Sequence, residues 1–483
     1  MADFLKNVFY PYFNIFLLGL FINSSVSAFS DGIKLTIHLR GVSESKISLM
    51  ALSGTKQFKS IKEVSVVKNG GTATLQIEKE HLPGEFVLRF DYMEKVSSTP
   101  YPSEKYIFIN NQDLELWVSP MYSNNPDSTW FQKNESENAA FSSFTKENGK
   151  HKEKLVLLQQ FLMNYDDTKS KFYQLGIEEY EKRRSAYNQW LDARVKSDKA
   201  LFVSSMYRFN YVPQISWSVS EKARIIGVIN HYFDGIDLND PIITKTSQLN
   251  EWMNSYVNLY GQMATTVALR DSLIPTAAKT AIEKAKQGNP IVYGWMVDYF
   301  YRGFESNNIP AGMKVLEPYL NDPNCLTSKR MEIERRLKGM QTLVVGSKAP
   351  DIVLKDNEGF LFDLNKFRPS QKYILLLFWS ADCSHCTETV ESLRPWHNQP
   401  EINQKITTVA VSLDETETEV ETWNQKIKTL PGWKHIQAPE GVRSKVAADY
   451  YILATPVMIL LDSNTKEILA MPETVSKLKD LIR

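Results

Sequence analysis

A nearly continuous apolar run from Tyr373 to Trp379 is followed, after a short polar segment, by a Cys-x-x-Cys pair, Cys383 and Cys386. Such a run is typical of a strand that is buried on both faces of a sheet flanked by helices. The residues after it predict a helix from Cys386 to about Leu393, closed by Pro395. This part of the chain is therefore constrained to an α/β fold in which the cysteines lie where a central strand gives way to a helix.

Strand and helix signals alternate over residues 345–483, which predicts one α/β domain there. A second buried strand is expected from Ile406 to Leu413, and a polar helix from Glu415 to Lys428. A third strand from Val457 to Leu461 is followed by a turn and then by Ile468 to Met471. That order predicts an antiparallel hairpin at the end of the domain.

The rest of the 483-residue chain is long enough for two further domains, at about 150 residues each. Alternating apolar and polar residues predict strands over residues 29–125, where we expect a small all-β sandwich. Within it, Asn69-Gly70-Gly71 predicts a hairpin between strands at Val64–Val67 and Ala73–Ile77. Segments without Pro or Gly recur at helical spacing over residues 126–340, which predicts a helical middle domain.

The N-terminus has the layout of a secretory signal, with Lys6, an apolar stretch from Val8 to Ile22, and small residues that end at Ala28. We predict a signal peptide over residues 1–28 and an exported, periplasmic mature chain. An uncleaved N-terminal anchor and a buried core helix are alternatives, because the stretch is close to the shortest membrane span. No later run reaches about 18 apolar residues, so membrane attachment is expected only through such an anchor.

Charge and cysteine content argue against several classes of protein. Lys plus Arg and Asp plus Glu are balanced at 56 each, so no nucleic-acid partner is expected. Three cysteines are too few for a disulfide-stapled scaffold, and Cys325 is expected to be an inert, buried thiol. No second C-x-x-C, C-x-x-H or H-x-x-H motif is present, so we predict no zinc or other metal site. The acidic run Asp414 to Glu419 is interpreted as the charged first turn of a helix.

The position of the cysteine pair at the start of a helix gives each thiol a role. Backbone N–H groups and the positive end of the helix dipole favour a thiolate at Cys383, the expected nucleophile. Cys386 follows about one helical turn later, where it can attack the mixed disulfide and release the product. Ser384 and His385 lie between them and are expected to tune the pair. A partial positive charge on His385 would stabilise the thiolate, whereas a solvated His would change little.

Taken in order, several pieces of this region resemble the TlpA/ResA-like branch of the thioredoxin superfamily. They are Gly346-Ser347-Lys348-Ala349-Pro350, an opening hairpin at Leu354–Gly359, Leu364, Phe378-Trp379 with Cys383 and Cys386, and Tyr451-Ile452 before Thr455-Pro456-Val457. The resemblance implies a thioredoxin-like fold, protein substrates, and a redox-active disulfide in place of a bound cofactor. It also implies a redox partner protein that docks at the same cysteines. The order of a β region, a helical region and this domain resembles exported multidomain bacterial members.

The resemblance implies roles for further residues. Trp379 would pack beside the cysteines, Pro456 would be a cis-proline that faces them, and Thr455 would offer backbone groups to a substrate strand. The sequence departs from thioredoxin itself in having no carboxylate in the strand before the motif, Tyr373 to Trp379. Another departure is Thr389 at the position where related proteins often have Glu. Glu388 is a candidate for proton transfer to the second cysteine, or it simply complements the helix dipole.

We therefore expect a thiol-disulfide oxidoreductase, either a reductase or an oxidase of proteins. A peroxiredoxin-like peroxide reductase is one alternative, because Ser380 stands three residues before Cys383, as Ser or Thr does in that family. Leu376 takes the place of that motif's proline, which argues against it. The other alternative is a non-catalytic binding or chaperone-like exported protein in which the β and helical regions do the work.

Overall fold

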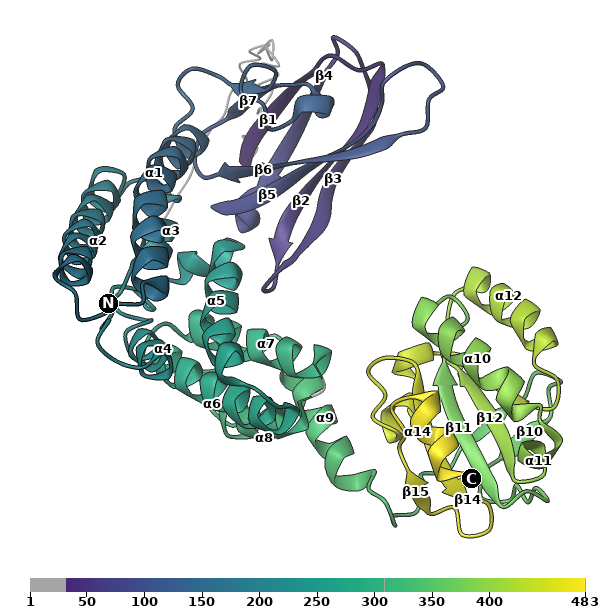
Figure 1. The fold of residues 1–483 in the computed structure, drawn as a ribbon. Coiled ribbons are helices and arrows are strands. Elements are labelled where there is room, and N and C mark those ends of the chain that lie inside the picture. Colours follow the sequence, from purple (N-terminus) through teal and green to yellow (C-terminus); the bar gives the residue numbers. More distant parts are fainter. Residues whose placement is uncertain (1–31, 308, 483) are drawn as a thin grey trace, which may run out of the picture.

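A computed structural model describes residues 32–307 and 309–482 of the chain. These residues form an N-terminal pair of β-sheets, a helical middle region and a C-terminal mixed sheet covered by helices (Figure 1). The predicted fold class is confirmed. The predicted signal segment, residues 1–28, lies outside the described residues, and the domain boundaries stay predictions.

The N-terminal region is built from two four-stranded sheets with the orders β4-β1-β7-β8 and β3-β2-β5-β6. Both sheets contribute apolar side chains to one core, as the alternating pattern requires. The strands are β1 (Gly32–Leu39), β2 (Glu44–Ser53), β3 (Gln57–Lys68), β4 (Thr72–Glu78), β5 (Gly84–Met93), β6 (Tyr101–Ile109), β7 (Leu114–Val118) and β8 (Trp130–Phe131).

The predicted hairpin around Asn69-Gly70-Gly71 is wrong, although the chain does turn there with Gly70 at a φ of 75°. β3 pairs with β2, whereas β4 pairs with β1 in the other sheet. The turn therefore carries the chain across the sandwich. A local turn signal reports the change of direction, but the partner of each strand is decided by the sheet that buries its apolar face.

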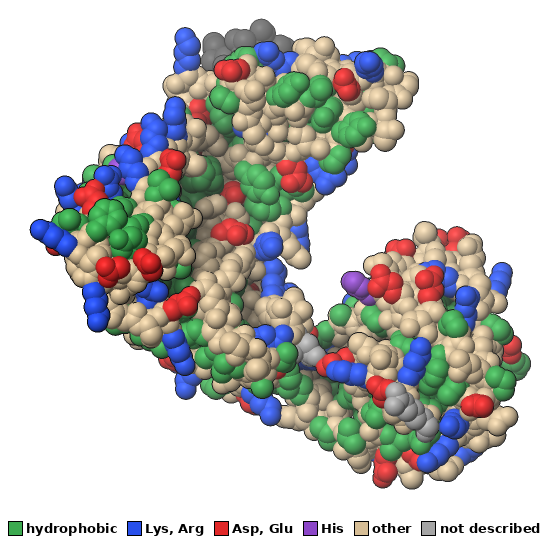
Figure 2. Space-filling view, in the orientation of Figure 1, with side chains coloured by type: hydrophobic (Ala, Val, Ile, Leu, Met, Phe, Trp, Pro, Cys, Tyr) green, Lys and Arg blue, Asp and Glu red, His purple; other side chains and the backbone are tan. Residues whose placement is uncertain are grey.

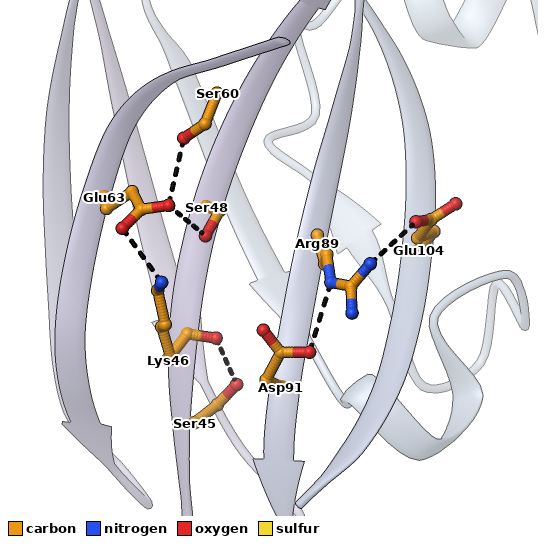
Figure 3. Close-up of polar contacts among 8 residues, drawn as sticks. All are labelled: Ser45, Lys46, Ser48, Ser60, Glu63, Arg89, Asp91 and Glu104. Carbon is orange, nitrogen blue, oxygen red and sulfur yellow. Dashed lines mark hydrogen bonds and ion pairs between the residues drawn. The ribbon is translucent and has the colours of Figure 1, made fainter. Parts of the chain in front are cut away.

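The solvent-exposed face of the β3-β2-β5-β6 sheet carries charged pairs, some between neighbouring strands and one within β5 (Figure 3). Lys46 lies 2.9 Å from Glu63, and Arg89 lies 3.1 Å from Asp91 and 3.8 Å from Glu104. Exposed pairs of this kind contribute little to stability. The sheet is stabilised mainly by its opposite, apolar face.

The helical region begins with two long helices that pack side by side and continues with seven shorter ones (Figure 1). No helix in the described ranges is long and apolar enough to cross a membrane. The helices are α1 (Glu137–Asn164), α2 (Lys171–Ser197), α3 (Ser204–Tyr207), α4 (Glu221–Asn230), α5 (Gln248–Met263), α6 (Val267–Lys286), α7 (Pro290–Ser306), α8 (Pro310–Leu320) and α9 (Arg330–Thr342).

Two of the contacts that tie the sandwich to the helical region involve Glu85 and Thr55. Glu85, at the start of β5, is buried and accepts hydrogen bonds from the hydroxyl of Thr246 at 2.9 Å and from the backbone N–H and hydroxyl of Ser247 at 2.6 and 2.9 Å. At the turn between β2 and β3, the Thr55 hydroxyl accepts a hydrogen bond from Arg302 of α7 at 3.0 Å. A buried carboxylate with three donors resists separation, because parting the regions would leave it without those partners.

The C-terminal sheet has the order β13-β12-β11-β14-β15, with β11 parallel to β12 and antiparallel to β14. Apolar clusters cover both faces of β11, as its sequence predicts. The elements are β9 (Val353–Lys355), β10 (Leu361–Asp363), β11 (Tyr373–Trp379), α10 (Ser384–His397), α11 (Pro400–Asn403), β12 (Ile406–Ser412), α12 (Glu417–Lys426), β13 (Lys434–Gln437), α13 (Lys445–Asp449), β14 (Val457–Asp462), β15 (Ile468–Ala470) and α14 (Val475–Leu481).

Both hairpins predicted in this domain are confirmed, since β9 pairs with β10 and β14 with β15. The prediction that Pro395 ends the helix after the motif is wrong, because α10 continues to His397. Pro395 lies in the last turn. A proline there removes one backbone hydrogen bond near an end that already leaves carbonyl groups unpaired, so the helix ends shortly after it.

Candidate active site

The junction between β11 and α10 places Cys383 at the N-terminus of a helix. Its backbone is extended, with φ −91° and ψ 121°, and its Sγ accepts a hydrogen bond from the N–H of Cys386 at 3.2 Å. Cys383 is therefore the N-cap residue, whose side chain satisfies one of the helix's unpaired donors. The N–H group and the helix dipole both favour negative charge on this sulfur. The predicted position of the pair is confirmed.

The thiols of the pair differ in their surroundings. Cys383 is half-buried, whereas Cys386 is fully buried. Burial raises the pKa of Cys386 to about 11, and its hydrogen bond with Cys383 acts in the same direction. All three cysteines are free thiols in the structure, and burial raises the pKa of Cys325, in the helical core, to about 11 as well. The sulfur of Cys383 is accessible from solvent, whereas Cys386 lies beneath the surface as a neutral thiol.

A loop before β14 faces the pair. The bond between Thr455 and Pro456 is cis, and the Sγ of Cys383 lies 3.8 Å from the Thr455 carbonyl oxygen. Trp379, which is fully buried, belongs to the same apolar cluster as Cys386 and Cys383. The structure thus brings together five of the residues that the sequence singles out, while their roles stay predictions.

Ser384 and His385 are exposed on the first turn of α10, and Glu388 is exposed just after that turn. The His385 Nδ1 lies 3.6 Å from the Glu388 Oε2, and within the described ranges neither side chain forms a hydrogen bond with Cys383 or Cys386. A carboxylate beside the imidazole offsets the positive charge that His385 would offer to the thiolate. The tuning roles of these three residues stay predictions, and any such effect would act through space.

A buried carboxylate, Asp414, fixes the loop that leads to Cys383. It follows β12 and accepts hydrogen bonds from the Ser380 hydroxyl at 2.6 Å, the Ala381 N–H at 2.9 Å and the Ser412 hydroxyl at 2.7 Å. The interpretation of the acidic run as a helix's first turn is confirmed for Glu417 and Glu419 of α12, but it is wrong for Asp414, which precedes the helix. Its position just after a predicted buried strand could have indicated this role. The carboxyl ends of parallel strands meet at one edge of a sheet, so the residues that follow β12 lie beside those that follow β11.

The other side of the same loop is held by a cation. The Lys426 ammonium, at the end of α12, donates hydrogen bonds to the Ala381 carbonyl at 2.6 Å and to the Thr387 hydroxyl at 2.8 Å. Asp414 thus binds the N–H of Ala381 while Lys426 binds its carbonyl. The peptide groups just before Cys383 are held from both sides, which fixes the entry into α10.

The cis-proline loop also borders the helical region. Residues 450–457 form one wall of a groove, and the other wall comes from α7 and α9. Glu305 and Arg336 form an ion pair at 3.0 Å on that second wall. Gly339 of α9 approaches Tyr451 so closely that an added Cβ would lie 2.7 Å from the Tyr451 Cβ. The helical region therefore bounds the space into which a chain bound at the loop would extend.

One comparison with known proteins agrees with the fold of the C-terminal region. Residues 371–467 match the model of a thioredoxin-like protein family. Similar solved structures include a thioredoxin-like protein from Bacteroides caccae, with 19% identity over 56% of this chain and 96% of that one, at a TM-score of 0.37. The thioredoxin domain of a thiol-disulfide oxidoreductase from Bacteroides vulgatus shows 29% identity over 29% of this chain and 96% of that one, at a TM-score of 0.25. No similar protein was found among those with curated descriptions.

Replacing Asp414 by Ala is expected to lower the free energy of unfolding by about 3 kcal/mol, since it leaves a buried N–H and two hydroxyls without their acceptor. Urea titration followed by circular dichroism measures this. Asp382→Ala, which changes an exposed carboxylate in the same loop, is the matched control and should alter stability little. Equal stability of the two variants would contradict the anchoring role of Asp414.

The burial of two thiols predicts selective alkylation of the reduced protein. At about pH 8, iodoacetamide should modify Cys383 at least about ten times faster than Cys386 or Cys325, because only a reachable thiolate reacts quickly. Raising the pH toward the pKa of about 11 of the two buried thiols should narrow this difference. Peptide mass spectrometry at timed quenches gives each rate. Comparable alkylation rates for all three thiols near pH 8 would contradict the difference in accessibility between Cys383 and the two buried thiols.

Proposed function

We propose that this protein exchanges disulfides with other proteins through Cys383 and Cys386, as a protein-disulfide reductase or oxidase. One observation carries the proposal: a half-buried Cys383 accepts a hydrogen bond at a helix N-terminus from the N–H of the buried Cys386. The match of residues 371–467 to a thioredoxin-like family supports it. The reactive group is then the dithiol or disulfide of the chain itself.

In the reductive direction, the Cys383 thiolate attacks one sulfur of a client disulfide. The client S–S bond breaks, a mixed disulfide forms, and the displaced client thiolate takes up a proton. Cys386 then loses its proton and attacks the Cys383 sulfur, which releases the second client thiolate. The client gains two electrons and two protons, and Cys383 and Cys386 are left joined by a disulfide. The oxidative direction is the reverse sequence.

The burial of Cys386 separates the two steps in time. A pKa near 11 keeps its thiol protonated while Cys383 meets the client. The thiol can attack only after the mixed disulfide forms and a base removes its proton. Glu388 stays the proposed candidate for assisting that transfer.

The client is proposed to be an extended protein segment. Thr455 presents its backbone beside Cys383, and a segment that pairs with it would pass the groove bounded by Glu305 and Arg336. A redox partner protein would restore the pair by docking at the same sulfur. Export through the segment 1–28 to a periplasm belongs to the same proposal, because disulfide chemistry on proteins suits an oxidising compartment.

Removing the resolving thiol tests the proposal. A Cys386→Ser variant cannot release the client, so it should retain disulfide-linked proteins that disappear on treatment with a reductant. Non-reducing gels of the protein purified from its own cells, after acid trapping of thiols, display these adducts. The Cys383→Ser variant is the matched control and should retain few or none.

Two other results would redirect the assignment. Adducts that are equally abundant in Cys383→Ser and Cys386→Ser would exclude Cys383 as the nucleophile. Rapid consumption of hydrogen peroxide by the wild-type protein, lost in Cys383→Ser and without client adducts in Cys386→Ser, would indicate the peroxidase alternative instead.

A further inference from the structure

A cleft lies between the β-sandwich and the helical region, away from the cysteine pair. Its volume is about 740 Å³, within the range of sites for small molecules. The turn between β2 and β3 forms one side, and α5, α6 and α7 form the other; Figure 1 shows this turn reaching toward α5 and α7. The cleft shares no lining residue with the groove at the cis-proline loop.

The cleft has an excess of positive charge. Lys56, Arg270 and Arg302 line it, and none of the described residues that line it is acidic. Arg270 is paired with Asp271 at 2.6 Å, but Arg302 has no carboxylate within 4.0 Å among the described residues and donates only to the Thr55 hydroxyl. Figure 2 shows Lys and Arg side chains near the tip of the β2–β3 turn. A guanidinium with unused N–H groups suits a carboxylate or phosphate.

A row of amides crosses the helical wall. Asn250, Asn254 and Asn258 are spaced four residues apart on α5, so their side chains lie on one face of the helix, about 5 to 6 Å apart. The Asn254 Oδ1 accepts a hydrogen bond from the Tyr299 hydroxyl at 2.8 Å, which leaves the Asn254 NH₂ group for another partner. The row can therefore both donate and accept hydrogen bonds.

Asn250 marks the inner end of the row. Its side chain is 4% exposed, and it forms no hydrogen bond with any residue in the described part of the chain. Neither polar atom of this amide is among the enclosed, unpaired side-chain atoms of the described residues, so the amide keeps access to the open space of the cleft. A buried amide that lines a positively charged cleft without a partner points to a ligand with polar groups.

We propose that this cleft binds a small organic anion. Its carboxylate or phosphate group lies at Arg302, and its hydroxyl or amide groups bond to Asn250, Asn254 and Asn258. Val257 and Phe300 supply apolar surface for the carbon skeleton. Lys56 lines the same cleft from the sandwich, so the ligand lies between the sandwich and the helical region. This site does not depend on the redox chemistry of the cysteines.

Calorimetric titration of the full chain tests the proposal at matched ionic strength. The probes are glucuronate, glucose 6-phosphate, citrate, inorganic phosphate and glucose. At least one organic anion should bind with a Kd of about 1 mM or tighter. Inorganic phosphate should bind more weakly and glucose not at all. Comparison of glucuronate with glucose 6-phosphate distinguishes a carboxylate ligand from a phosphate ligand. Absence of binding by all three organic anions up to about 10 mM would overturn the proposal.

Variants place the binding in the cleft. Arg302→Ala should raise the Kd of the bound anion about tenfold or more, because it removes the charged donor. Asn250→Asp is nearly isosteric and puts a carboxylate at the inner end of the row, so it should abolish binding of the anion. Asn258→Asp makes the same change at an exposed position of the row, where folding is not at risk, and should also weaken binding. Lys182→Ala on α2 removes a charge elsewhere and should bind normally. Unchanged affinity in Arg302→Ala and Asn258→Asp would contradict the site.

Discussion

The hydrogen bonds that hold the peptide of Ala381 determine the geometry of the cysteine pair. Asp414 binds its N–H from the end of β12, and Lys426 binds its carbonyl from the end of α12. With this peptide fixed, the chain enters α10 so that Cys383 caps the helix and its sulfur meets the N–H of Cys386. Backbone donors would thus stabilise the negative charge of a thiolate at Cys383. The charged side chains, Asp414 and Lys426, act on the loop rather than on the sulfur.

The three regions of the chain are joined at places where ligands could bind. Glu85 ties the sandwich to the helical region, and the cleft near Arg302 opens along the same boundary. At the other end of the helical region, Gly339 of α9 packs against Tyr451, beside the cis-proline loop. A substrate segment at the cysteines would therefore meet the helical region, and a ligand in the cleft would bridge the two upstream regions.

Features encoded by neighbouring residues could be predicted from the sequence. The apolar run of β11 and the motif after it place Cys383 at a strand-to-helix junction, because both signals are local. The role of Asp414 depends on two parallel strands that are distant in the sequence and meet at one sheet edge, and its acidic neighbours resemble a helix start. The turn at Gly70 is local too, but the sheet that each flanking strand joins is not. Asn250 and Arg302 line one cleft only because α5 and α7 both pack against α6.

Thiol-disulfide exchange at this site is tested most directly by the redox equilibrium of the Cys383/Cys386 pair in glutathione buffers, with Cys325 replaced by Ala and free thiols counted at each poise. One reversible two-electron step is expected, with a potential between about −270 mV, typical of a reductant, and about −120 mV, typical of a strong oxidant. The value within that interval assigns the direction of exchange. The absence of a reversible two-electron step at any poise would contradict thiol-disulfide exchange as the function of this site.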